Sequence, residues 1–184
     1  MTITAKEETR TCRICDEEKR LELFEVDKRY KGGYSNRCKL CKFQSNTKPA
    51  KAFRRFYEKQ NKYPIPVETD LQEIEVLFDI CSDHCAYCSE PFDSTPTIDH
   101  ITPLSMEGSR HHISNLQLVC DSCNSRKRDK SLFVFFEDTP EFSESNLRSV
   151  IKMIAYFSGR HIFDVMDELQ AQYKRYYAER RSIS

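Results

Sequence analysis

The spacing of the cysteines constrains this chain more than any other feature of its sequence. Eight of its nine cysteines form four C-x-x-C pairs, and only Cys81 stands outside them. Two such pairs together supply the four thiolates of one closed tetrahedral zinc site. The sequence therefore predicts two structural zinc ions, each held by two pairs. The ligands are Cys12, Cys15, Cys38 and Cys41 for the first zinc, and Cys85, Cys88, Cys120 and Cys123 for the second.

Other uses of paired cysteines fit the chain less well. Disulfides belong mainly to secreted proteins, and the opening segment MTITAKEETRTC lacks the apolar core of a secretion signal. A redox protein typically has one C-x-x-C motif, at the start of a helix that follows a strand. The presence of four pairs argues against that use. No stretch approaches the roughly 20 apolar residues that cross a bilayer. We therefore expect a cytoplasmic protein that does not bind membranes, in which Cys81 is a small buried side chain rather than a ligand.

Charge is segregated along the chain although the net charge is zero. Residues 1–62 carry 17 Lys and Arg against 9 Asp and Glu, whereas residues 63–99 carry nine acidic residues and no Lys or Arg. A basic segment is the electrostatic signature of a polyanionic partner, because cationic side chains displace counterions from phosphates. The same segment can also be merely a well-solvated surface. Within it, Arg37, Arg54 and Arg55 are candidate contacts to a nucleic acid.

The order of modules predicts an α+β protein. Residues 9–47 read as a small zinc ribbon with too few apolar residues to fold without metal, and such modules bind either DNA or protein. Residues 48–66 read as a basic helix and a stiff linker that includes Tyr63-Pro64-Ile65-Pro66. Residues 67–135 hold the second cysteine quartet. Residues 136–184 hold two amphipathic helices, over about 144–158 and 162–181.

The central module begins with a predicted helix near Thr69, whose spacing to Gln72 resembles a capping box. Between the halves of the second quartet, residues 97–102 read as a strand that Pro103 ends. Residues 116–119 read as its antiparallel return. Asn124 is then expected to open a helix.

Four polar residues of this module suggest phosphodiester chemistry. Asp99 and Asn124 offer the hard oxygen ligands that a divalent cation prefers. His100 is the natural general base at neutral pH. Neighbouring residues on a regular strand point to opposite faces, so Asp99 and His100 serve one site only if the strand ends or twists there. Asn115 is expected to hold the loop that bears His100 through hydrogen bonds to its backbone.

These residues resemble the HNH nuclease family, and in particular its subgroup whose ββα-metal finger is pinned by two C-x-x-C pairs. The resemblance covers about residues 85–131 and rests on Asp99-His100-Ile-Thr-Pro, Gly108, Asn115-Leu-Gln-Leu, Cys120-x-x-Cys123-Asn124 and Lys127. It departs from many family members in having Asn124 where they have histidine. It departs also in having Glu107-Gly108 in place of Gly-Gly. A zinc module ahead of such a nuclease looks similar to phage-encoded enzymes, which would place the protein in a host cytoplasm.

The resemblance implies a role for each residue. His100 would deprotonate the attacking water, and Asp99 and Asn124 would hold one Mg²⁺ or Mn²⁺ ion that stabilises the leaving 3′ oxygen. Asn115 would orient the histidine loop. Lys127 would contact phosphate, as would Arg126 and Arg128, although Lys127 could also be an ordinary helix-surface cation. The products would carry 5′-phosphate and 3′-hydroxyl ends.

The expected function is therefore hydrolysis of double-stranded DNA, by nicking or by cutting both strands. A homodimer and a phage or host protein partner both remain open. The alternative from a different class is a non-catalytic, zinc-dependent nucleic-acid-binding or regulatory protein that keeps the finger only as a scaffold. Such a scaffold needs the cysteines but not Asp99, His100 and Asn124.

Overall fold

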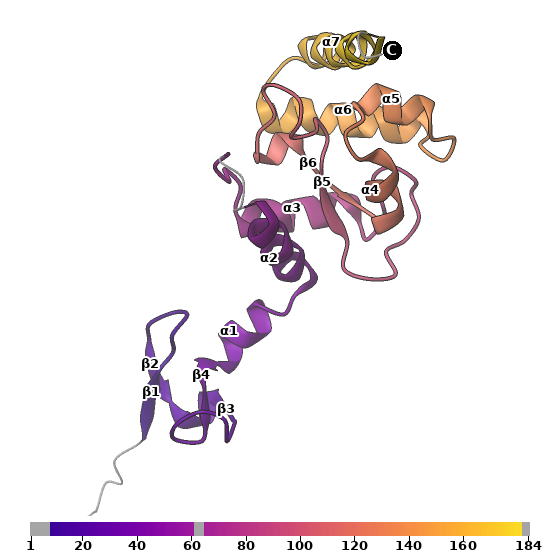
Figure 1. The fold of residues 1–184 in the computed structure, drawn as a ribbon. Coiled ribbons are helices and arrows are strands. Elements are labelled where there is room, and N and C mark those ends of the chain that lie inside the picture. The colour runs from indigo at the N-terminus through magenta and orange to yellow at the C-terminus, as the bar shows by residue number, and fades with distance from the viewer. Residues whose placement is uncertain (1–7, 61–64, 182–184) are drawn as a thin grey trace, which may run out of the picture. The chain divides into compact units, whose positions relative to one another are not determined.

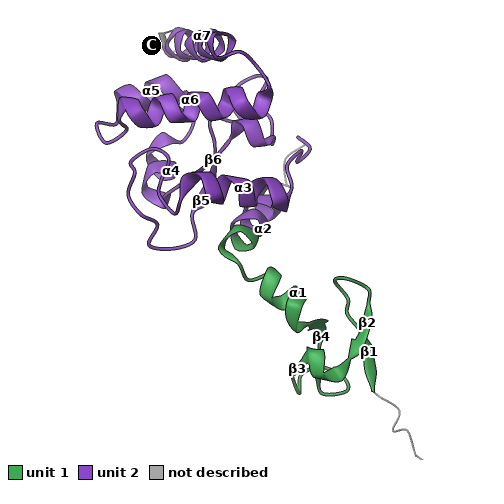
Figure 2. Cartoon of the chain, turned by 180° about the vertical axis from the view of Figure 1, so that it is seen from behind, with its two compact units in different colours: residues 1–51 green, residues 52–184 purple. Residues whose placement is uncertain are grey.

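The computed structural model describes residues 8–60 and 65–181. The chain divides between Lys51 and Ala52 into two compact units, coloured separately in Figure 2. Of the expected linker, Tyr63 and Pro64 lie outside the described residues. Within the described ranges, no helix is both long and apolar enough to span a membrane.

The first unit is built from two antiparallel hairpins and a short helix. Strand β1 pairs with β2, and β3 pairs with β4. Its small core consists of Phe24 and three cysteines of the first quartet. Within the segment Leu21–Val26, the first half forms a 3-10 turn and the second half pairs as a strand. The elements are β1 (Thr9–Thr11), β2 (Glu18–Arg20), β3 (Phe24–Val26), β4 (Tyr34–Cys38) and α1 (Lys39–Gln44).

The second unit places one β-hairpin between helices, and with the first unit it confirms the α+β class. Helix α2 begins before the unit boundary and ends within this unit. Figure 1 shows α2 and α3 on one side of the β5–β6 hairpin and α5, α6 and α7 on the other. The elements are α2 (Lys48–Gln60), α3 (Leu71–Cys81), β5 (Thr97–His100), β6 (Leu116–Val119), α4 (Asp121–Lys127), α5 (Leu132–Glu137), α6 (Glu144–Ser158) and α7 (Ile162–Arg181).

Apolar clusters on the two sides of this hairpin form the core. The register pairs Ile98 with Leu118 and Asp99 with Gln117. Ile98 and Leu118 pack against Phe56 of α2 and Leu77 of α3. Because side chains alternate along a strand, the opposite face meets the cluster of the C-terminal helices. That cluster centres on Tyr87, Val119, Leu132, Phe135, Phe142, Val150, Val165 and Leu169.

Three predicted boundaries need correction, and one further helix was not foreseen. Asp70 rather than Thr69 caps α3, since its Oδ1 accepts a hydrogen bond from the Glu73 amide at 2.9 Å. Strand β5 ends at His100, two residues before the expected Thr102. Helix α4 starts before Asn124, because the Sγ of Cys120 caps it by accepting from the Cys123 amide. Helix α5, which carries the buried Leu132 and Phe135, was not predicted.

Candidate active site

The structure brings each cysteine quartet together as the spacing predicted. The sulfur atoms within each quartet all lie within 4.8 Å of one another, which suits one tetrahedral ion. Backbone amides support the sulfurs: the amide of Cys38 donates to Cys12 Sγ at 3.3 Å, and that of Cys120 donates to Cys85 Sγ at 3.3 Å. Cys81 belongs to neither quartet, and its Sγ contacts Gln117 Oε1 at 3.4 Å.

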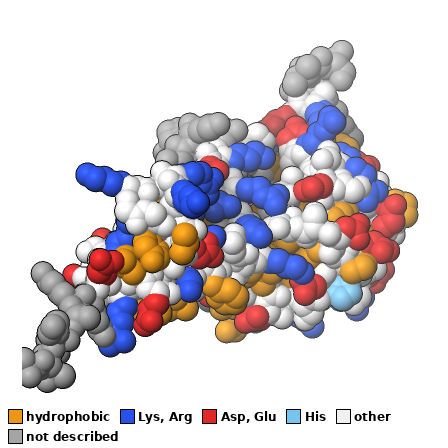
Figure 3. Space-filling view, turned by 90° about the horizontal axis from the view of Figure 1, so that it is seen from below, with side chains coloured by type: hydrophobic (Ala, Val, Ile, Leu, Met, Phe, Trp, Pro, Cys, Tyr) orange, Lys and Arg blue, Asp and Glu red, His pale blue; other side chains and the backbone are white. Residues whose placement is uncertain are grey.

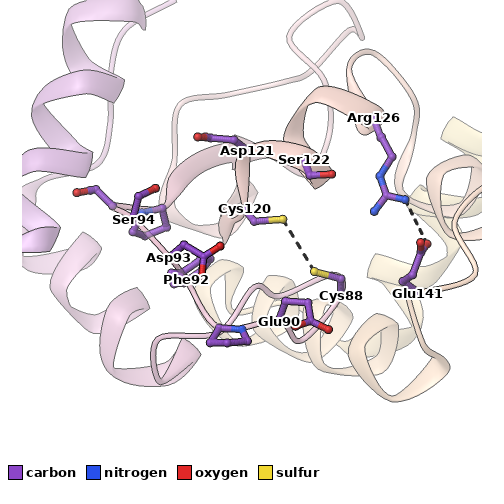
Figure 4. Close-up of a pocket in the computed structure, with 13 residues that line it drawn as sticks. Cys88, Glu90, Phe92, Asp93, Ser94, Cys120, Asp121, Ser122, Arg126 and Glu141 are labelled. Carbon is purple, nitrogen blue, oxygen red and sulfur yellow. Dashed lines mark hydrogen bonds and ion pairs between the residues drawn. The ribbon is translucent and has the colours of Figure 1, made fainter.

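The second quartet ties the hairpin to helix α4. Figure 4 shows Cys88 and Cys120 with their sulfur atoms pointing toward each other beside a pocket, at a separation of 3.9 Å. A hydrogen bond from Cys123, assisted by backbone amides, lowers the pKa of the Cys85 thiol to about 4. A thiol held as thiolate is a ready metal ligand. A zinc ion at this quartet would join residues 85–88, which precede β5, to the start of α4.

Asp99 is buried on the side of the hairpin that faces α4. Its Oδ2 accepts a hydrogen bond from the hydroxyl of Tyr87 at 2.8 Å and lies 3.1 Å from the ammonium of Lys127. The Tyr87 hydroxyl is fully buried, and burial followed by the adjacent Asp99 raises its pKa well above the usual value. Tyr87 therefore stays protonated and donates its hydrogen bond to the carboxylate.

His100 is buried on the other side of the same strand. Its Nε2 lies 2.8 Å from Nδ1 of His111, and its ring packs on Phe56 with the centroids 5.6 Å apart. Burial, followed by the charges of His111, Lys127 and Lys59, lowers the pKa of His100 to about 3. The imidazole is therefore neutral at physiological pH and retains one nitrogen lone pair for accepting a proton.

Strand alternation keeps Asp99 and His100 on opposite faces up to the end of β5. The carboxylate of Asp99 contacts Tyr87 and Lys127, whereas the imidazole of His100 contacts His111 and Phe56. The expected strand end is present, but it falls immediately after His100. The two side chains therefore flank the end of the strand rather than contacting each other.

Asn115 clamps the loop that follows β5. Its Oδ1 accepts from the amide of Thr102 at 2.7 Å, and its Nδ2 donates to the carbonyls of Thr102 at 3.1 Å and Arg110 at 3.0 Å. Its backbone carbonyl also accepts from the amide of Ile101 at 2.9 Å. These bonds join both ends of the loop that runs from His100 to His111.

Asn124 lies in the middle of α4, half-buried, and lines a pocket of about 460 Å³. Arg55 and Lys59 of α2, together with Thr97 and Ile98 of β5, line the same pocket. Among the described residues, no hydrogen bond joins Asn124 to Asp99. Both donors to Asp99 reach Oδ2, which leaves Oδ1 as the oxygen that can face a cation.

Lys127 corrects the expectation of a DNA contact, because its side chain is completely buried. Its Nζ donates to the carbonyl of His100 at 2.6 Å and pairs with Asp99. Lys127 lies on the helix that was expected after Asn124, but its side chain points into the unit because α4 packs directly on β5. In this arrangement its ammonium is not accessible to a phosphate.

The other predicted DNA contacts have different surroundings. Arg126 pairs with Glu141 at 3.2 Å, as Figure 4 shows, while Arg128 is exposed at the end of α4. Arg54 and Arg55 are exposed on α2, and Arg37 is half-buried in the first unit. Lys and Arg side chains gather over the middle of the face drawn in Figure 3.

His111 is the residue that the sequence interpretation missed. It belongs to no motif in the sequence, yet it is fully buried and touches the candidate base. Its distance of eleven residues from His100 carries no signal by itself. Only the loop closed by Asn115 brings the two rings together.

A family model covers the residues of this site. Residues 85–130 match the family model described as HNH endonuclease, a range that contains the second quartet and all four polar residues. The chain has no significant match among curated proteins. The crystal structure of the Type II-C Cas9 enzyme from Actinomyces naeslundii aligns with a TM-score of 0.40 and 17% identity, over 73% of this chain and 14% of that one. Residues 85–130, with their zinc-type cysteine cluster and buried Asp-His strand, therefore form a domain of the HNH endonuclease family.

Proposed function

We propose that this chain is a divalent-metal-dependent endonuclease that hydrolyses phosphodiester bonds in double-stranded DNA. The observation that carries the proposal is the match of residues 85–130 to the HNH endonuclease model, together with a neutral, buried histidine at the end of β5. That histidine is positioned by a second histidine and by a loop clamp, as a general base requires.

The residues fit one hard divalent cation. Asp99 supplies a carboxylate oxygen and Asn124 an amide oxygen, and Mg²⁺ commonly takes one or two carboxylates plus water and substrate phosphate. Such an ion would stabilise the negative charge that develops on the leaving 3′ oxygen. Lys127 already compensates the charge of Asp99, so we expect the ion to bind weakly unless a phosphate also contributes.

In the proposed reaction, His100 accepts a proton from a water molecule as that water attacks phosphorus. The new P–O bond forms while the bond from phosphorus to the 3′ oxygen breaks, and the 3′ oxygen leaves with a proton taken from solvent. The products carry 5′-phosphate and 3′-hydroxyl ends. Asn115 keeps the His100 loop in place, and exposed Arg55 and Lys59 beside Asn124 offer cations to the DNA backbone.

The rival function is a zinc-dependent nucleic-acid-binding or regulatory protein without catalysis. Two observations favour it: a buried lysine neutralises Asp99, and Phe56 packs against the His100 ring. A pure scaffold, however, does not need a histidine with a neutral ring at the strand end, and the proposed nuclease does.

The deciding experiment incubates supercoiled plasmid with Mg²⁺ or Mn²⁺ and compares the wild-type protein with His100→Ala. His161→Ala is the matched control, because His161 is exposed at the start of α7. We expect nicking by the wild type and by the control, and its loss in His100→Ala. One site per chain makes single-strand nicks the expected first product. Equal cleavage by all three proteins, or binding without cleavage by all three, contradicts the proposal.

A further inference from the structure

His111 has the environment of a functional rather than a structural histidine. It is fully buried, and its Nε2 has no hydrogen-bond partner within the described parts of the chain. Within residues 8–60 and 65–181, the one side chain that its ring hydrogen-bonds is His100, at 2.8 Å from Nδ1 to Nε2. An unpaired buried polar atom destabilises a fold. A leucine or phenylalanine would fill this space without that cost.

The backbone around His111 is held firmly in place. Its carbonyl accepts from the amide of Glu68 at 2.9 Å, and it forms a bridge with Val67. The neighbouring Arg110 pairs with Glu68 at 2.8 Å. The His111 and Phe56 rings meet almost at right angles, at a centroid distance of 5.9 Å. The position of Nδ1 relative to His100 is thus set by contacts from two other segments.

Two tautomeric arrangements satisfy the hydrogen bond between the His100 and His111 rings. They differ in whether His100 keeps a lone pair that can accept a proton from water. If His111 Nδ1–H donates to His100 Nε2, then His100 carries its own proton on Nδ1 and has no lone pair left for water. If His100 Nε2–H donates to His111 Nδ1, then His100 Nδ1 is unprotonated and can accept a proton. No hydrogen bond to His100 Nδ1 exists within the described residues, so that nitrogen is available.

We propose that His111 is the positioning residue of the general base: it accepts the Nε2–H of His100 and so presents Nδ1 of His100 as the basic nitrogen. This inference rests on the proposed nuclease function. When Nδ1 takes the proton of the attacking water, the positive charge on the His100 ring is shared through the Nε2–H bond to His111. A neutral histidine thereby performs the orienting role that a carboxylate performs in other catalytic pairs.

The activity test compares His111→Asn with His111→Phe under steady-state conditions on a short duplex. Asparagine places its Oδ1 near the position of Nδ1 and can still accept from His100, whereas phenylalanine fills the space without an acceptor. We expect His111→Phe to lower kcat on the order of 100-fold, the scale of lost orienting partners, with KM little changed. His111→Asn should recover most of this loss. His161→Phe, at an exposed site, serves as the control.

A nearly unchanged kcat in His111→Phe overturns the proposal, as does an equal loss of kcat in folded His111→Phe and His111→Asn. Nitrogen-15 NMR of the imidazoles tests the same idea in the wild-type protein without any need for activity or for a folded variant. Finding His100 as the Nε2–H tautomer supports the proposal, and finding it as the Nδ1–H tautomer overturns it. Failure of the proposed nuclease function can be told apart from failure of this inference, because wild type and His100→Ala would then be equally inactive whatever the tautomer of His100.

Discussion

Lys127 offers the sharpest test of how the domain is held together. Replacing it with methionine keeps most of the side-chain volume but removes the ammonium that lies between Asp99 Oδ2 at 3.1 Å and the His100 carbonyl at 2.6 Å. The substitution leaves the Asp99 carboxylate buried, with the Tyr87 hydroxyl as its one donor among the side chains that the structure describes.

The magnitude follows from burial. At 3.1 Å the attraction between two unit charges is about 5 kcal/mol at an effective dielectric of 20. Breaking a buried pair by removing one partner typically costs about 3–5 kcal/mol, because the remaining charge is left uncompensated. For a chain of this length, that loss corresponds to a decrease in Tm of roughly 6–20 °C.

The matched control is Lys130→Met, which breaks a partly exposed pair with Asp138 at 2.8 Å. Such pairs contribute only about 0–1 kcal/mol. We would measure urea unfolding by circular dichroism at 222 nm, with zinc present throughout, for wild type and both variants. A loss below about 1 kcal/mol in Lys127→Met, similar to that of Lys130→Met, would refute the assignment of Lys127 to the interior. It would also restore Lys127 as a candidate phosphate contact.

Three further predictions follow from the site. Asn115→Ala should lose about 2 kcal/mol of stability and lower the nicking rate roughly tenfold, because it releases the loop between Thr102 and Arg110. Urea unfolding measures the first effect and plasmid nicking the second. The control variant Ser114→Ala should change neither quantity. Acid should destabilise the fold, because burial lowers the pKa of His100 to about 3 while an unfolded histidine titrates near 6.5. The unfolded chain then binds more protons between those values, so the free energy of unfolding should fall by about 1.4 kcal/mol from pH 7.5 to 5.5, and His100→Leu should lack that part of the loss in urea titrations at the two pH values. Cys123→Ser should lose one zinc ion, measured by native mass spectrometry, and much of the helical signal in circular dichroism. Cys12→Ser should also lose one zinc ion but keep the helical signal, because α3 to α7 belong to the second unit. An equal loss of helical signal in both variants would contradict separate zinc-dependent units.

Much of the molecule could be inferred from local sequence alone. The C-x-x-C spacing determines that two thiolates of each pair lie close together, and the structure confirms both quartets. Helices over 144–158 and 162–181 follow from apolar periodicity and from Gly159, whose positive φ of 63° ends α6. The strand pair around Asp99 follows from its apolar neighbours and Pro103. The C-x-x-C pairs and the helices depend on contacts between residues that are near each other in the chain.

Only the tertiary structure decided which side chains surround the candidate site and how they are oriented. The sequence could not show that Lys127 points inward, since a cation three residues beyond Asn124 looks the same on a solvated helix as on one packed against β5. Nor could it pair His100 with His111, because the distance between their rings depends on a loop closed by Asn115 and on Phe56 from a distant helix. Burial and long-range packing, which determine the charge state and orientation of each side chain, are properties of the whole fold and not of any local pattern.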